Sequence, residues 1–169
     1  MLPEIWAVRT AAAVFGGRKE REKVIDEMEL QNCINYLLTV AQHEVFQAFS
    51  NKLAQFNITP GQYGVLGCLW ENGSCTPKEI AQILHLENST ISGVLDRMQK
   101  RGLIDRVVDP NDRRSVQVVT TVEGSAMKDD VLRLIGELNE EILGGFAPEQ
   151  RSVLIQGLRQ IGRVTEDEA

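Results

Sequence analysis

Apolar residues recur at helical spacing through the first long segment of the chain. Between residues 30 and 56 they follow one another at steps of three and four: Leu30, Ile34, Leu37, Ala41, Val45, Phe49, Leu53 and Phe56. This period predicts one α-helix, roughly 40 Å long at the standard rise per residue. A helix of that length extends beyond the core of so small a chain. We therefore expect part of its apolar face to meet a second subunit.

Two helix starts follow, and both have the same capping chemistry. Residues 59–62 are Thr-Pro-Gly-Gln, and residues 76–79 are Thr-Pro-Lys-Glu. In this capping box the threonine and the Gln or Glu each accept a hydrogen bond from a backbone N–H that the helix leaves without a partner. The pattern predicts helices over residues 60–72, 77–84 and about 88–101.

The period changes after Gly102. Residues 103–108 and 116–120 are rich in β-branched side chains and flank a polar turn, Asp-Pro-Asn-Asp-Arg-Arg, at residues 109–114. This arrangement predicts a hairpin with an exposed, charged tip. The helical period then returns in two segments that Gly144-Gly145 separates. The predicted fold is mainly α with a small β-wing: four helices, a two-stranded wing and two further helices.

The pattern over residues 77–96 predicts a helix-turn-helix. Its expected interhelix core is Ile80, Leu84, Leu86, Ile91 and Val94, with Ala81 where the two helices cross most closely. Such a core projects the second helix beyond the protein surface, so that its first residues can reach base edges in the major groove of DNA. We expect Ser89, Thr90 and Ser92 on that outward side. His85 takes the turn, where its tolerance of positive φ suits it, and we assign it no chemistry.

These segments resemble the winged helix-turn-helix of the multiple-antibiotic-resistance regulator (MarR) family of bacterial transcription factors. The most specific match is the turn at residues 109–114, which is similar to the family's D-P-x-D-x-R wing signature. A strand and a T-x-x-G helix start at residues 121–124 follow it, as in the family. Residues 95–98 and 100–104 match the end of the family's recognition helix and the start of its wing. The likeness extends over residues 29–163.

The resemblance implies four regions. Residues 1–25 are an N-terminal extension of unassigned role, and residues 26–58 a dimerisation helix. Residues 59–120 form the winged helix-turn-helix DNA-binding lobe, and residues 121–169 the C-terminal dimerisation helices. The family's mode of action implies a homodimer that binds a pseudo-palindromic operator in double-stranded DNA and acts as a repressor.

The same resemblance implies the DNA contacts. Ser89 or Thr90 caps the recognition helix and approaches phosphate or bases, as does Ser92 one turn on, while Arg97 reaches phosphate. At the wing tip, Arg114 enters the minor groove beside Arg113, and the Asp112 carboxylate holds the Arg114 side chain in place. Asp96 is expected to pair with Arg114 from the recognition helix. The alternative for Asp96, Arg97 and Arg101 is a solvated helix face held by pairwise salt bridges.

Regulators of this family usually respond to small anionic ligands, often aromatic, bound between the dimer helices and the winged lobe. Tyr36, His43 and Phe46 lie at helical spacing beside the apolar stripe of the first helix, and Gln62, Tyr63 and Trp70 come from the next helix. His43 could donate to a carboxylate and the rings could enclose a flat ligand. We therefore expect an aromatic acid or its thioester as effector. The alternative is that the aromatic residues are core and His43 is a surface residue.

Composition narrows the possible partners. The chain has 169 residues and a net charge of −6, which disfavours a protein that coats nucleic acid without sequence preference. Residues 89–115 nevertheless carry a net charge of +2, and residues 121–169 a net charge of −5. A local DNA-binding face is therefore compatible with an acidic molecule. No apolar run long enough to span a membrane and no signal-peptide pattern are present, so a cytoplasmic protein without a membrane partner is expected.

With three cysteines and two histidines, the chain has few candidate residues for a metal site or for redox chemistry. Cys33, Cys68 and Cys75 are widely spaced, which suits neither a disulfide framework nor a zinc site, and we expect buried free thiols and no cofactor. A thiol-based redox sensor using Cys33 is an alternative. Organic-hydroperoxide sensors of this family, however, place their reactive cysteine at the position of Asn35.

Two other classes of protein are alternatives to a DNA-binding regulator. The sequence contains no G-x-S-x-G, glycine-rich phosphate loop or H-E-x-x-H motif, so an enzyme is not expected. A winged helix used only for protein–protein contact is a more credible alternative than an enzyme. Such a module would not need the two arginines at the wing tip.

Overall fold

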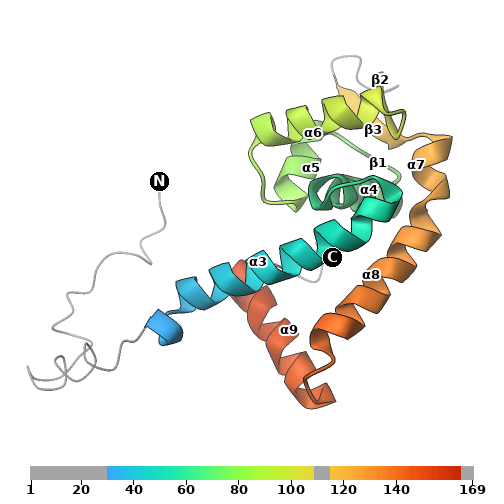
Figure 1. Ribbon diagram of the computed structural model, residues 1–169. Helices are drawn as coiled ribbons and strands as arrows, with labels where there is room; N and C mark the ends of the chain where they lie inside the picture. Colours follow the sequence, from blue (N-terminus) through green and yellow to red (C-terminus); the bar gives the residue numbers. More distant parts are fainter. Residues whose placement is uncertain (1–29, 109–114, 165–169) are drawn as a thin grey trace, which may run out of the picture. The chain divides into compact units, whose positions relative to one another are not determined.

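The computed structural model describes residues 30–108 and 115–164. The chain divides into two compact units, residues 1–44 and residues 45–169, and each is treated by itself. The helix α3, Ile34–Leu53, runs across the boundary (Figure 1). Short 3-10 helices flank it, η2 at Leu30–Asn32 and η3 at Ala54–Phe56. The prediction of one regular helix from Leu30 to Phe56 is therefore correct only for its central part. The left-handed Asn57, at φ 60°, ends the segment.

Both predicted capping boxes are confirmed, and they begin α4, Pro60–Asn72, and α5, Pro77–Ile83. The Thr59 N–H donates to Gln62 Oε1 at 3.0 Å, and the Gln62 N–H donates to Thr59 Oγ1 at 3.3 Å. At α5 the Thr76 N–H donates to Glu79 Oε2 at 2.7 Å, and the Glu79 N–H donates to Thr76 Oγ1 at 3.2 Å. Each box thus satisfies two backbone donors at a helix start.

The β-sheet has three strands where the sequence predicted two. Strands β2, Ile104–Val108, and β3, Val116–Thr120, form the predicted antiparallel hairpin. A two-residue strand β1, Ser74–Cys75, adds to the other edge of β3, which gives the order β1-β3-β2. Two residues are too few to show an alternating pattern, so β1 has no sequence signal of its own. Buried Cys75 pairs with Val118 at the centre of the sheet.

The segment after the wing also differs from the prediction. The expected single helix is divided at Met127 into α7, Val122–Ala126, and α8, Lys128–Leu143, and α9 follows at Pro148–Gly162. Thr121 caps α7 by accepting from the Gly124 N–H at 3.1 Å. Its own hydroxyl donates to Gly102 O at 2.6 Å, and its N–H donates to Leu103 O at 3.2 Å. These bonds fix α7 against the chain between α6 and β2.

The core of the second unit lies among α4, α5, α6, the sheet and the first half of α8. Its fully buried large side chains include Leu66, Leu69, Ile80, Ile91, Leu95, Met98, Ile104, Val118 and Val131. The predicted interhelix core is correct for Ile80, Ile91 and Val94, and Ala81 is buried as expected. Leu84 is half-buried against this core. Leu86 is wrong as a core residue: it is 42% exposed, because it follows the turn before α6 begins.

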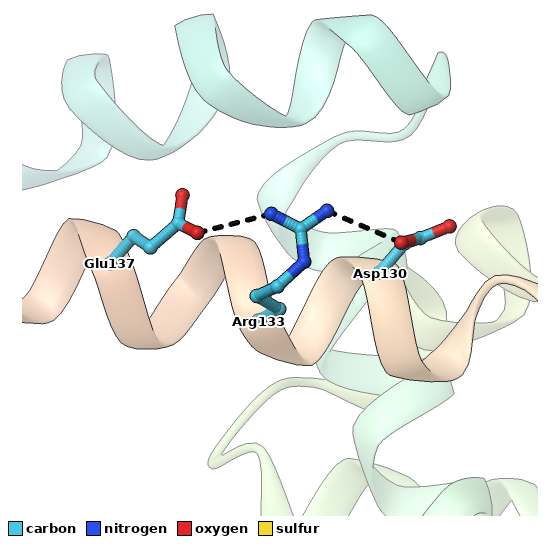
Figure 2. A network of polar contacts seen from close by, with 3 residues as sticks. All are labelled: Asp130, Arg133 and Glu137. Atoms are coloured by element: carbon cyan, nitrogen blue, oxygen red, sulfur yellow. Dashed lines mark hydrogen bonds and ion pairs between the residues drawn. The ribbon is translucent and has the colours of Figure 1, made fainter.

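Most exposed side chains of α8 are polar. Arg133 lies between Asp130 and Glu137, one turn away on either side, with its guanidinium 3.2 Å from Asp130 Oδ1 and 3.0 Å from Glu137 Oε1 (Figure 2). The hydrogen bond to Asp130, followed by that to Glu137, raises the pKa of the Arg133 guanidinium. Such pairs at three- and four-residue spacing support an exposed helix.

Two absences hold for the part of the chain that the structure describes. None of its helices combines the length and the apolar character needed to cross a bilayer. No group of three or more His, Cys, Asp or Glu side chains within residues 30–108 and 115–164 is placed to hold a metal ion.

Candidate nucleic-acid interface

The turn between α5 and α6 has the geometry that the sequence predicted. His85 has φ 50°, which confirms that it occupies a left-handed turn position. Its N–H donates to Gln82 O at 3.1 Å, and the Leu86 N–H donates to Ala81 O at 2.9 Å. These bonds close the turn, and buried Ala81 lets the two helices approach each other. His85 thus has a structural role in the turn.

The recognition helix α6, Asn88–Lys100, has one buried side and one exposed side. Its buried residues are Ile91, Val94, Leu95 and Met98. We call the opposite side, which carries Ser89, Ser92, Gly93, Asp96, Arg97 and Lys100, the outward side of α6. Except for half-buried Gly93, all of these residues are exposed, as is Thr90. The structure therefore places all four candidate DNA-contacting residues of this helix on the protein surface.

The start of α6 differs from the expectation of a capping Ser or Thr. The helix begins at Asn88, and its N-cap is Glu87, whose side chain forms no capping hydrogen bond. Ser89 and Thr90 consequently lie inside the first turn. The Ser92 hydroxyl donates to Asn88 O at 2.9 Å, so its proton is used within the helix and its oxygen can accept from a DNA base.

Asp96 has a partner that the sequence analysis missed. Its carboxylate lies 2.7 Å from the guanidinium of Arg106 on β2, and Arg106 Nη1 also donates to Gln99 Oε1 at 3.1 Å. Arg106 therefore braces the wing against α6 and neutralises a carboxylate on the outward side. The alternation along β2 could have indicated that Arg106 faces the protein, since Arg106 shares a strand face with buried Ile104.

Arg101 connects the end of α6 to the start of α4. Its Nη1 donates to Gln62 Oε1 at 3.2 Å. That oxygen also accepts the capping bond from Thr59, and Gln62 is only 5% exposed. Arg101 thus has a structural role, but through a hydrogen bond to a buried amide and not through the salt bridges of a solvated helix face that the alternative described. Arg97, by contrast, extends over the outward side of α6.

The comparisons with known proteins agree with this geometry. Residues 58–116 match the MarR family model. The organic hydroperoxide resistance transcriptional regulator of Bacillus subtilis is 32% identical to this chain. The matched region covers 69% of this chain and 80% of that protein. The chain belongs to the MarR family. Because its relatives are transcriptional regulators, it is not an enzyme.

Solved structures of MarR-family proteins share the fold. A probable transcriptional regulator from Pseudomonas aeruginosa superimposes with a TM-score of 0.73 at 28% identity, covering 79% of this chain and 99% of that one. CouR from Rhodococcus jostii, solved bound to p-coumaroyl-CoA, has a TM-score of 0.74 at 25% identity, covering 82% and 98%. Both support the winged helix-turn-helix assignment.

The tip of the wing lies outside the described residues. The hairpin is described as far as the Val108–Val116 pair, at which the two strands still pair in register. Asp112, Arg113 and Arg114, which the resemblance assigns to DNA, fall between these two positions. Their roles remain predictions.

The candidate effector residues of this MarR-family chain are divided between its two units. Tyr36 and His43 are exposed in the first unit, and Phe46 is exposed at the start of the second. In the second unit, the Trp70 indole N–H donates to Gly124 O at 3.1 Å. Trp70 therefore helps to anchor α7. The oxygen of Gln62 already accepts two hydrogen bonds, as described above.

Tyr63 packs beside Phe49, with the two ring centroids 6.3 Å apart. Burial, followed by the charge of Glu71, raises the pKa of the Tyr63 hydroxyl. Tyr63 is therefore a neutral, half-buried aromatic residue near neutral pH. The ligand assignments of all six residues stay predictions.

Two of the three cysteines are buried free thiols, as expected. Burial raises the pKa of Cys68 to about 11, and it also raises the pKa of Cys75. The Cys75 thiol donates to Cys68 O at 3.9 Å. Cys33 differs from the expectation of burial because it lies half-buried just before α3. Redox sensing through Cys33 stays a prediction.

Proposed function

We propose that this MarR-family chain is a repressor that binds a pseudo-palindromic DNA operator as a homodimer and is released by a small aromatic acid or its thioester. The observation that carries the DNA-binding part is the outward side of α6. It is exposed and polar, and its one carboxylate is paired with Arg106. Such a surface can approach phosphates and base edges without a repelling charge.

Within this proposal each candidate residue has a distinct contact. Ser89, Thr90 and Ser92 face the phosphates or bases of the major groove, and Arg97 supplies the positive charge at the centre of the helix. At the wing, Arg114 enters the minor groove with Arg113 beside it, and Asp112 orients the guanidinium. A permanently charged guanidinium suits the negative potential of a narrow minor groove.

The homodimer is supported by apolar side chains that no residue of the described chain covers. On α9, Val153 is 69% and Ile161 60% exposed, and no residue of this helix is fully buried. In the first unit, Leu30 and Ile34 are also exposed. Exposed apolar surface of this extent marks an interaction site. We assign it to the second subunit, with residues 26–58 and 121–169 as the dimerisation regions.

The effector proposal rests on the exposed aromatic and polar residues of α3. Tyr36, His43 and Phe46 present two rings and an imidazole on one helix, which is the chemistry that a flat aromatic acid needs. CouR, a relative with the same fold, was solved with p-coumaroyl-CoA, an aromatic acid thioester. Gln62, Tyr63 and Trp70 of α4 are the further candidate ligand-binding residues.

The proposal is tested first by selection of bound DNA from a random pool with the full chain. We expect a pseudo-palindrome whose half-site centres are one helical turn apart, roughly 34–36 Å. Sedimentation at micromolar concentration should give about twice 18.9 kDa. A stable folded monomer contradicts the dimer. Failure to select any DNA makes a protein–protein winged helix the better explanation.

The effector is tested by thermal shift with a panel of aromatic acids and their thioesters, repeated on His43→Ala. A ligand that stabilises the wild-type protein should stabilise the variant less and should release operator DNA. A ligand whose effect is the same on both proteins removes His43 from the site. Hydrogen peroxide or an organic hydroperoxide, tested on operator binding by wild type and Cys33→Ser, separates the redox alternative.

A further inference from the structure

Gly93 lies in the middle of α6, where a glycine lowers helix stability. Relative to alanine it costs roughly 0.5–1 kcal/mol in a helix interior. The fold does not require it: φ at Gly93 is not positive, and of the described residues only Arg97 comes within 4 Å of the position a Cβ would take. Gly124 is different, because a Cβ there would overlap the carbonyl oxygen of Leu103. The reason for Gly93 must therefore be sought outside the packing of the chain.

Gly93 is on the outward side of α6. At 100° per residue it stands in one row with Ser89, four residues earlier, and Arg97, four residues later. The buried residues Ile91 and Val94 lie on the other side of the helix. Gly93 is nevertheless only half exposed. The side chain of Arg97 lies next to this position.

Arg97 extends back along the helix toward its N-terminus, the direction that helical side chains favour. Its Nη1 comes to 3.6 Å from the Cβ position of Gly93. The guanidinium therefore lies over the second turn of α6, one turn before its own backbone. A long side chain at position 93 would compete for this space.

We propose that Gly93 is a specificity-determining position of α6. By leaving the second turn without a side chain, it allows the Arg97 guanidinium to lie there and read a guanine in the major groove of each half-site. This inference rests on the proposed DNA-binding function and assigns Arg97 to a base, beyond the phosphate contact given above. Guanine is the base that fits, because its O6 and N7 accept the two parallel N–H donors of a guanidinium.

The surroundings of Arg97 suit this role. Asp96, its neighbour in sequence, is held by Arg106 at 2.7 Å, so that carboxylate already has a cationic partner on the wing. The residues of the first two turns on the outward side, Ser89 and Ser92, are short. Arg97 is thus the long side chain closest to the middle of this surface, and it can reach past the serines to a base edge.

The test measures base preference with the full-length protein. DNA is first selected from a random pool by the wild-type chain. Binding constants are then determined for the selected duplex and for duplexes in which each guanine is replaced symmetrically in both half-sites. We expect one guanine whose replacement weakens wild-type binding roughly tenfold or more per half-site.

Arg97→Lys and Arg97→Ala should lose this preference. The lysine variant should retain more overall affinity because it keeps the charge. Gly93→Gln should also lose the preference, since the glutamine side chain occupies the place of the guanidinium. In Gly93→Gln/Arg97→Ala no further loss of the preference is expected, because both changes remove the same contact. Gly61→Gln is the matched control, a helical glycine of α4 with nothing within 4 Å of its Cβ position, and should leave the preference unchanged.

Three results from the variants overturn the inference: the guanine preference survives in Arg97→Ala, it survives in a folded Gly93→Gln protein, or the losses from the two positions add independently. Thermal melting of each variant establishes that it is folded. If the wild-type chain selects no DNA, the proposed function fails and the inference fails with it. Selection of a clear operator with no Arg97-dependent guanine overturns only the inference.

Discussion

Among the described glycines, Gly124 has the least space for a side chain. It lies in the first turn of α7, packed directly against the backbone of Leu103. A Cβ at this position would overlap the carbonyl oxygen of Leu103 and lie 3.1 Å from its carbonyl carbon. Gly124→Ala therefore forces α7 away from the chain by about 1 Å or more, since the obstacle is backbone and cannot rotate aside.

The magnitude follows from the bonds that this movement stretches. The Trp70 indole donates to Gly124 O at 3.1 Å, and Thr121 donates to Leu103 O at 3.2 Å and to Gly102 O at 2.6 Å. Each hydrogen bond contributes about 1 kcal/mol, and overpacking alone costs about 1–3 kcal/mol. We expect Gly124→Ala to lower the free energy of unfolding by about 2–4 kcal/mol. The melting temperature should fall by about 5–15 °C.

The measurement is urea unfolding followed by circular dichroism and by Trp fluorescence, with wild type and variant at equal concentration. Gly136→Ala on α8 is the control, because a Cβ there meets nothing within 4 Å of the described structure. That variant should be unchanged or more stable by up to about 1 kcal/mol. If Gly124→Ala unfolds at the same urea concentration as wild type, the close approach of α7 to Leu103 is wrong.

Three further predictions concern charge and protonation. Because burial raises the pKa of Cys68 to about 11, the folded chain holds this proton to higher pH than the unfolded chain does. The free energy of unfolding should therefore fall by about 2–3 kcal/mol between pH 8.5 and pH 11, and urea titrations of Cys68→Ala should give a shallower decline. Arg106→Ala should change stability by less than about 1 kcal/mol but weaken operator binding in fluorescence anisotropy, and Asp96→Asn in the same protein should restore part of the binding. Arg114→Ala should leave the melting temperature nearly unchanged and weaken operator binding by about 1–3 kcal/mol per wing. If the variant and the wild-type protein bind the operator with equal affinity at each of two salt concentrations, the wing does not read DNA.

Local chemistry explains which features could be predicted from the sequence. The capping boxes at Thr59 and Thr76 are correct because each needs only four consecutive residues. His85 is correct because a helix-turn-helix demands a left-handed residue at the turn and histidine tolerates it. Such features depend on neighbours along the chain, which the sequence displays directly.

The features that were missed depend on residues distant in sequence. Strand β1 exists because Ser74 and Cys75 meet β3, more than forty residues later. The partner of Asp96 is Arg106, whose position across the wing hairpin is set by the register of β2. The start of α7 is held by bonds from Thr121 to Gly102 and Leu103, which lie almost twenty residues earlier in the chain. Among these features, the local sequence offers a signal only for Arg106, through the alternation along β2.

The charges of the chain show how an acidic protein can present a surface to DNA. In the second unit several carboxylates of α8 have nearby cations: Lys52 lies 3.0 Å from Glu141, and Arg151 lies 2.7 Å from Glu140. On α6 the same arrangement removes the field of Asp96, while Arg97 and Lys100 remain on the outward side. Exposed charges farther apart than about 8 Å are largely screened at physiological salt. The local balance on α6 and the wing therefore matters more for DNA than the net charge of −6. Substituting Lys100, which adds charge to this surface, should thus weaken binding to all DNA sequences alike, whereas substituting Arg97 should weaken it selectively.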